Sequence, residues 1–189
     1  MKVVELVIDE NSEGVKAISV VDRPAIEENF IALSAHEVEL KEVNAEKRIL
    51  MGAALIPEKR IPRRVKEQSF AIYFSEQTVR KASELFLMNG NQSNATEQHL
   101  KAVDGMTVVE SWIIDNPEMD KSKAYNFNLP KGTWMISMKV ENDDVWSKVK
   151  SGEIKGFSIE GYFADKVDLN FEASPEQVIE QIKKILSNG

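Results

Sequence analysis

The sequence predicts an α+β fold with one main domain of short, mostly antiparallel strands and a few helices. The chain has 189 residues, 42% of them hydrophobic and 29% charged, which is ordinary for a globular domain with one sizeable core. Most apolar runs have the length of strands and end at glycine, proline or polar residues. A few other segments carry apolar residues at helical spacing instead.

The N-terminal part is predicted to contain two strands followed by a charged tether. Apolar and β-branched residues at 3–8 and 15–21 flank a polar, glycine-containing turn. Pro24 ends the second strand because proline has no N–H for the ladder. Residues 35–47 are rich in glutamate and lysine, which indicates either a solvated strand pair or a tether to the rest of the chain.

The next segment is predicted to form two buried strands and a helix. Residues 49–56 are a continuous apolar run that ends at Pro57, as expected for a strand buried on both faces. A second short strand is predicted at 70–74. Ser75 then caps a helix that continues to Met88 with apolar residues at helical spacing.

A β-hairpin is predicted around the Asp-Gly pair at 104–105, which is a favoured two-residue turn. Its strands would be 97–103 and 106–114, and His99 would then lie directly opposite Glu110. Directly opposed residues are close enough for the carboxylate to contact the imidazole and fix its tautomer. A register shift of one residue would turn Glu110 to the other face.

The last third is predicted to contain a strand at 133–140, a short helix at 142–150 and a strand at 155–163. Ser158 lies in this last strand between two glycines, which would let another backbone, such as a substrate strand, come close. A C-terminal amphipathic helix is predicted to pack on the domain or on a second subunit of a homodimer. The predicted parts are an N-terminal strand pair with its tether (1–45), a main domain (46–168), and a linker with a C-terminal helix (169–189).

Composition excludes several classes of function. A net charge of −7 and a pI near 5.1 argue against nucleic-acid binding, which needs a surplus of lysine and arginine. No apolar run is long enough to span a membrane, and the N-terminus lacks the pattern of a signal peptide, so we expect a cytoplasmic protein. With no cysteine and two histidines, we expect neither a metal nor another cofactor.

The candidate catalytic residues are His99 and Ser158. Histidine is the side chain that titrates near neutral pH, and without cysteine the usual nucleophile is a hydroxyl. Taken alone, each is more simply explained as an ordinary strand residue, and the glycine spacing around Ser158 is not that of a G-x-S-x-G elbow. The other histidine, His36, lies in the charged tether and is predicted to be solvated.

The order of motifs resembles the phage prohead (capsid maturation) serine proteases, most closely their XkdF-like branch. The resemblance covers nearly the whole chain, and it depends on the order and spacing of segments that are individually weak. The matching segments are ISVVDRPAI (18–26), GAALIP (52–57), His99 before the predicted hairpin, VVESWIID (108–115) and KGFSIEG (155–161).

This resemblance implies a small β-barrel flanked by helices, similar to the herpesvirus assemblin proteases. It implies a serine endopeptidase in which Ser158 is the nucleophile and His99 the general base, with Glu110 added as the third member by the hairpin geometry. The implied substrates are scaffold and major capsid proteins inside the assembling prohead of a phage, in the bacterial cytoplasm. The alternatives are a non-catalytic phage structural protein and a module that binds peptides by strand addition.

Overall fold

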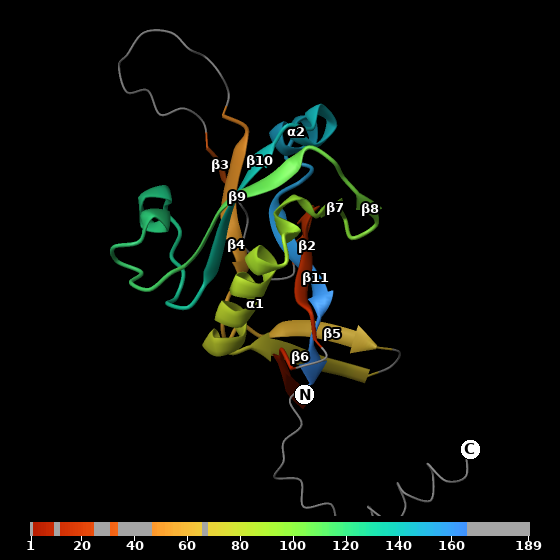
Figure 1. Ribbon diagram of the computed structural model, residues 1–189, viewed down its shortest axis with the longest axis vertical. Helices are drawn as coiled ribbons and strands as arrows, with labels where there is room; N and C mark the ends of the chain where they lie inside the picture. The colour runs from red at the N-terminus through yellow and green to blue at the C-terminus, as the bar shows by residue number, and fades with distance from the viewer. Residues whose placement is uncertain (1, 10–11, 25–30, 34–46, 66–67, 166–189) are drawn as a thin grey trace, which may run out of the picture.

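The computed structural model describes residues 2–9, 12–24, 31–33, 47–65 and 68–165 (Figure 1). Their regular elements follow one another as β1 (Lys2–Val7), β2 (Gly14–Val21), β3 (Ile31–Leu33), β4 (Ile49–Leu55), β5 (Ile61–Val65), β6 (Gln68–Phe74), α1 (Glu76–Met88), η1 (Asn91–Ser93), β7 (Ala95–Glu97), β8 (Lys101–Ala102), β9 (Met106–Ile113), η2 (Lys121–Tyr125), β10 (Trp134–Val140), α2 (Asp143–Lys150), β11 (Gly156–Tyr162) and β12 (Ala164–Asp165). The predicted tether up to residue 46, the predicted C-terminal helix and His36 lie outside these ranges.

The strands in the described part of the chain form three four-stranded sheets, so the fold is α+β as predicted. Their orders are β12-β1-β6-β5, β3-β4-β10-β9 and β11-β2-β7-β8. Within the described ranges, all pairs are antiparallel except β1 with β6 and β2 with β7. The pairing of these residues does not close a barrel.

Several predicted elements are present, with ends close to the predicted ones. The apolar run 49–56 forms β4 up to Leu55, one residue short of the predicted end, and this strand is buried along nearly its whole length between β3 and β10. Ser75 caps α1 by accepting a hydrogen bond from the Thr78 backbone N–H (3.4 Å), and Asn142 caps α2 through the Val145 N–H (3.0 Å). Local sequence signals are sufficient for these elements because their caps and apolar spacing are contained within the segment itself.

The two N-terminal strands exist, but they do not pair with each other. β1 lies between β12 and β6, whereas β2 lies between β11 and β7 in a different sheet. The apolar residues of β2 enter the common core, where Val15, Ile18 and Val20 have no exposed surface. Burial of this face against strands from distant parts of the chain therefore outweighs local pairing across the turn.

The predicted hairpin between 97–103 and 106–114 is wrong. β7 turns at residues 98–100 and pairs with β8, whereas β9 pairs with β10 along most of its length. Gly105 has the expected positive φ of 75°, but its carbonyl accepts hydrogen bonds from Glu141 N (2.7 Å) and Asn142 N (3.3 Å). Hydrogen bonds to this glycine thus link the start of β9 to the residues that follow β10, and the glycine does not close a hairpin.

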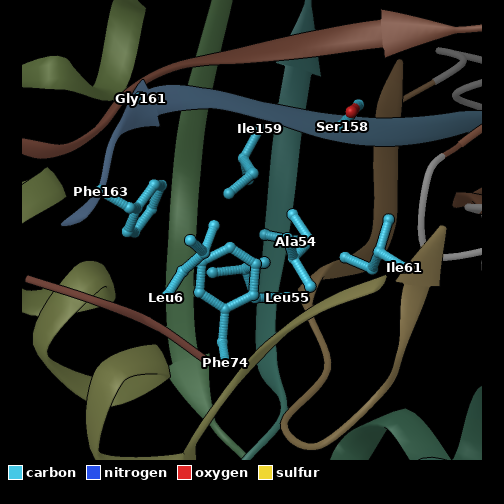
Figure 2. A pocket seen from close by; sticks show the side chains of 10 residues that line it. Leu6, Ala54, Leu55, Ile61, Phe74, Ser158, Ile159, Gly161 and Phe163 are labelled. Atoms are coloured by element: carbon cyan, nitrogen blue, oxygen red, sulfur yellow. The ribbon is translucent and has the colours of Figure 1, made fainter. Parts of the chain in front are cut away.

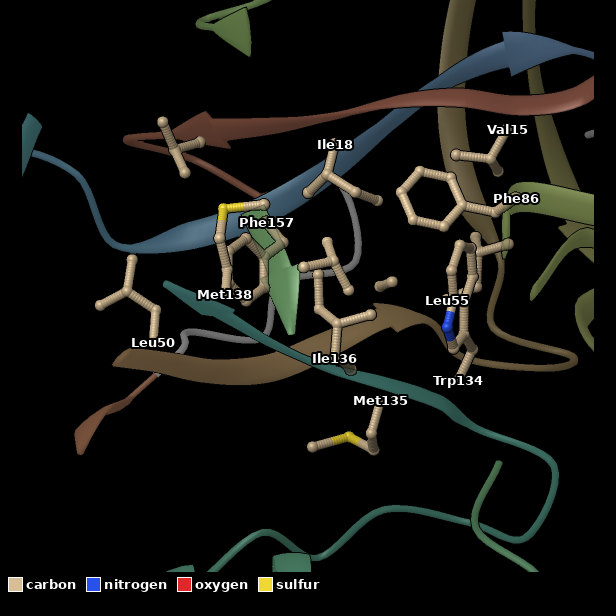
Figure 3. Packing of buried hydrophobic residues seen from close by; sticks show 14 of the residues in the cluster. Val15, Ile18, Leu50, Leu55, Phe86, Trp134, Met135, Ile136, Met138 and Phe157 are labelled. Carbon is tan, nitrogen blue, oxygen red and sulfur yellow. The ribbon is translucent and has the colours of Figure 1, made fainter. Parts of the chain in front are cut away.

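The core lies where α1, α2 and strands of all three sheets meet. Phe86 of α1 contacts Trp134 of β10 edge to face, with ring centroids 5.4 Å apart (Figure 3). Phe157 of β11 is also buried, which fixes one face of that strand against the core. Among the helices that the structure describes, none has the length and apolar character of a membrane span.

Candidate active site

Ser158 lies on the face of β11 that points away from the core. Its neighbours Phe157 and Ile159 pack against the core, and Figure 2 shows Ile159 and the Ser158 hydroxyl on opposite sides of the strand. Ser158 is opposite Ser19 of β2, and both residues are buried. Within the described ranges, Ser158 Oγ makes no hydrogen bond to another protein atom.

His99 lies in the tight turn that joins β7 to β8. Both Gln98 and His99 have positive φ angles, 52° and 58°, a conformation that residues other than glycine seldom adopt. The His99 backbone N–H donates to Ser19 Oγ (3.0 Å), and Ser19 in turn donates to the Thr96 carbonyl (3.3 Å). β2 therefore holds the turn in place through the serine that lies opposite Ser158.

The His99 side chain contacts Glu160, which follows Ser158 by two residues in β11. The distance between His99 Nδ1 and Glu160 Oε1 is 3.1 Å. Thr96 Oγ1 donates a second hydrogen bond to the same carboxylate oxygen. Because residues two apart in a strand share a face, Ser158, Glu160 and the His99 imidazole lie on the same side of this sheet.

This arrangement can perform acid-base chemistry on a hydroxyl. A carboxylate that accepts from Nδ1–H selects the tautomer in which Nε2 carries a lone pair. The same carboxylate stabilises the positive charge that appears when Nε2 takes a proton. The imidazole is 42% exposed and Glu160 32%, so both groups are open to solvent, whereas Ser158 is buried beside them with 7% of its surface exposed.

Glu110, the predicted partner of His99, lies in β9 and faces Ser137 of β10. Its carboxylate accepts hydrogen bonds from Ser137 Oγ (2.5 Å) and Lys121 Nζ (2.8 Å). The Lys121 ammonium, and next the Ser137 hydroxyl, hold the pKa of Glu110 below its ordinary value. The structure therefore does not bring Glu110 to His99, because the strand pairing on which that prediction depended is absent.

A comparison with known families agrees with the resemblance seen in the motifs. A family model described as "Putative phage serine protease XkdF" matches residues 37–168, more than half of the chain. The chain belongs to this XkdF family. No curated protein and no solved structure matches it.

The segment that matches the XkdF family contains Ser158, His99 and Glu160, but not all of the residues that surround them. Ser19 belongs to β2, which precedes the matched segment and lies between β11 and β7. The geometry of the site therefore depends on a strand outside the part of the chain that defines the family.

Glu160 is the member of this cluster that sequence reasoning missed, although a signal for it exists. Ser158 and Glu160 are separated by one residue within a predicted strand, so they must share a face. Ser19 gives a similar signal, as a polar residue between Ile18 and Val20 in an apolar strand. The contact of both residues with the His99 turn was not predictable, because it depends on the pairing of β2 with β7.

The glycine after the serine has a different role from the predicted one. A Cβ atom at Gly161 would lie 2.1 Å from the Gly14 carbonyl oxygen, so the backbone that approaches it closely is that of β2. Within the described ranges, β11 pairs with β2 on one edge and with no strand on the other. That second edge, beside Ser158, is where an additional strand could bind.

Proposed function

We propose that this XkdF-family chain is a serine endopeptidase in which Ser158 is the nucleophile, His99 the general base and Glu160 the residue that orients the imidazole. The observation that supports this most strongly is the 3.1 Å contact between His99 Nδ1 and Glu160, on the face of β11 that also carries Ser158. Glu160 thereby takes the third role, for which the sequence had suggested Glu110.

The proposed reaction proceeds through an acyl-enzyme. His99 Nε2 accepts the proton from Ser158 Oγ as the oxygen attacks the scissile carbonyl, and His99 then protonates the leaving amine. Water hydrolyses the ester by the same proton transfers, while Glu160 keeps its contact with Nδ1 and orients the imidazole. Ser158 and His99 share no hydrogen bond among the described residues, and catalytic hydrogen bonds of this kind commonly form only when substrate is bound.

The proposed substrates are segments of phage scaffold and major capsid proteins, cleaved inside the assembling prohead in the bacterial cytoplasm. Membership of a phage serine protease family supports a phage substrate. The unpaired edge of β11 supports an extended peptide, because such an edge offers backbone donors and acceptors to an added strand.

A fluorophosphonate probe tests the proposal. We expect attack by Ser158 Oγ, with formation of an O–P bond and loss of fluoride, and a mass-spectrometric map that places the adduct on Ser158. Ser158→Ala should not be labelled, whereas Ser12→Ala, at an exposed turn that contacts Asp9, should be labelled like the wild type. Binding of extended peptides without any labelling would instead support the non-catalytic peptide-binding alternative.

A further inference from the structure

A cavity of about 160 Å³ lies against the other face of β11, beneath the strand that carries Ser158 (Figure 2). Strands of all three sheets contribute to its wall. They are β1, β5 and β6 of one sheet, β4 of the second and β11 of the third. The lining residues are Leu6, Ala54, Leu55, Ile61, Ile72, Phe74, Ser158, Ile159, Gly161 and Phe163.

The chemistry of this wall selects an apolar occupant. Apart from Ser158, whose hydroxyl lies on the opposite side of β11 (Figure 2), the lining residues are aliphatic or aromatic, with one glycine, and none is charged. A charged group in the cavity would lose its hydration without gaining a partner. The size is also suitable, because a cavity of about 150 Å³ lined by leucine, isoleucine and phenylalanine accommodates benzene.

The cavity is also placed where a substrate strand would project its side chains. Side chains of an extended peptide alternate between the two faces of the sheet that it joins. A peptide added to the unpaired edge of β11 would present its scissile carbonyl to Ser158 near one face. Side chains of alternate residues would point toward the opposite face, where Ile159 and Phe163 border the cavity.

We propose that this cavity is a specificity pocket that takes one large apolar side chain, of the size of leucine, methionine or phenylalanine, from the substrate. The proposal depends on the proposed function, because it places the substrate on the edge of β11 beside the nucleophile. Ala54 and Phe163 would then determine the specificity. Ala54 is nearly fully buried at the cavity wall, and Phe163 packs edge to face on Phe74 with ring centroids 4.9 Å apart.

The test uses the full chain and a set of tripeptidyl diphenyl phosphonates, in which alanine is replaced by leucine, phenylalanine or aspartate at one position at a time. We expect leucine at one position to raise the rate constant for Ser158 labelling about tenfold or more over the all-alanine probe, as for a missing methylene in a hydrophobic pocket. Aspartate at that position should abolish labelling.

Two variants connect the preference to the cavity. Ala54→Val should remove most of the leucine advantage, whereas Ala53→Val, one residue away on β4 and equally buried but outside the wall, should retain it. Phe163→Ala enlarges the cavity and should shift the preference from leucine toward phenylalanine, which keeps the test valid if Ala54→Val does not fold.

The outcomes separate this inference from the proposed function. If a simple fluorophosphonate labels Ser158 but no position favours leucine, the pocket is refuted and the enzyme is not. An advantage that survives Ala54→Val and Phe163→Ala equally also refutes the pocket. If the simple fluorophosphonate does not label the wild type, the proposed function fails, and this inference fails with it.

Discussion

At the residue scale, the conformation of His99 and the orientation of its ring are set by different neighbours. Ser19 of β2 accepts from the backbone N–H of His99, and Glu160 of β11 contacts the side chain at Nδ1. A left-handed backbone at a residue other than glycine costs free energy, and such conformations often occur at functional sites. The two contacts explain how this turn is maintained and why the ring faces β11.

Glu160→Gln should reduce kcat/KM for a cleaved peptide by about 10² to 10⁴, because the amide no longer selects the correct tautomer or stabilises the imidazolium. Glu110→Gln is the matched control, since the same change is made on a strand that does not contact His99. Its kcat/KM should stay within about twofold of wild type. Equal losses in the two variants would contradict the role given to Glu160.

Glu110 should contribute to stability in a pH-dependent manner. Its pKa is lowered in the folded chain, first by Lys121 and then by Ser137, so the ionised form favours folding. This contribution is present above the ordinary carboxyl value of 4.5 and is lost as the pH falls through the lowered folded pKa. Both side chains of the ion pair are more than one-third exposed, so solvent screens the interaction. The contribution of Glu110 to the free energy of unfolding is therefore below about 1 kcal/mol.

Urea unfolding of wild type and Glu110→Gln at pH 7 and at pH 3 measures this effect. The wild type should be more stable than the variant at pH 7, and the difference should shrink at pH 3. A difference that is independent of pH would show that the ion pair with Lys121 does not contribute.

Some residues of the candidate site can be predicted from the sequence, and others cannot. Ser158 and His99 could be selected from the sequence because a chain with two histidines and no cysteine offers few alternatives. Glu160 shares a face with Ser158 by strand periodicity alone, but its contact with His99 requires β11, β2 and β7 to lie side by side. Glu110 was selected through a hairpin that does not form.

At the element scale, local signals specify strands and helices but not which strands pair. β4, α1 and α2 were predicted close to their observed ends because their apolar spacing and caps are local. The parallel pairing of Ser19 in β2 with Thr96 in β7 joins residues far apart in sequence, and no turn motif encodes it. The Asp-Gly pair at 104–105 lies at a turn, but this turn connects β8 of one sheet to β9 of another.

Gly161→Ala should be strongly destabilising, because the new Cβ would lie 2.1 Å from the Gly14 carbonyl oxygen, and a paired backbone cannot move away easily. We expect a loss of about 3 kcal/mol in the free energy of unfolding. At Gly90 the added atom meets open space but the φ of 71° is unfavourable for alanine, so Gly90→Ala should cost only about 1–2 kcal/mol. A smaller loss for Gly161→Ala than for Gly90→Ala would show that β2 and β11 are not packed this closely.

At the scale of the whole molecule, the N-terminal strands belong to two different sheets. β1 lies between β12 and β6, and β2 between β11 and β7, so each has neighbours on both sides. The segment that matches the family begins at residue 37, after both strands. The matched segment alone would therefore lack a central strand of the sheet that carries Ser158.

A chain of residues 37–189 should consequently fail to unfold cooperatively and should not be labelled at Ser158. Loss of β2 removes the backbone partner of β11 and the Ser19 hydroxyl that contacts the His99 turn. Thermal unfolding followed by circular dichroism, together with fluorophosphonate labelling, measures both effects. Cooperative unfolding with normal labelling would contradict the placement of β2.

The structure of the chain after reaction with a phosphonate tests the central claim most directly, because it reports all three residues at once. We predict phosphorus bonded to Ser158 Oγ, His99 Nε2 at hydrogen-bond distance, about 2.6–3.2 Å, from an oxygen of the adduct, and Nδ1 still on Glu160. An adduct on another residue, or one on Ser158 that His99 does not reach, would contradict the account.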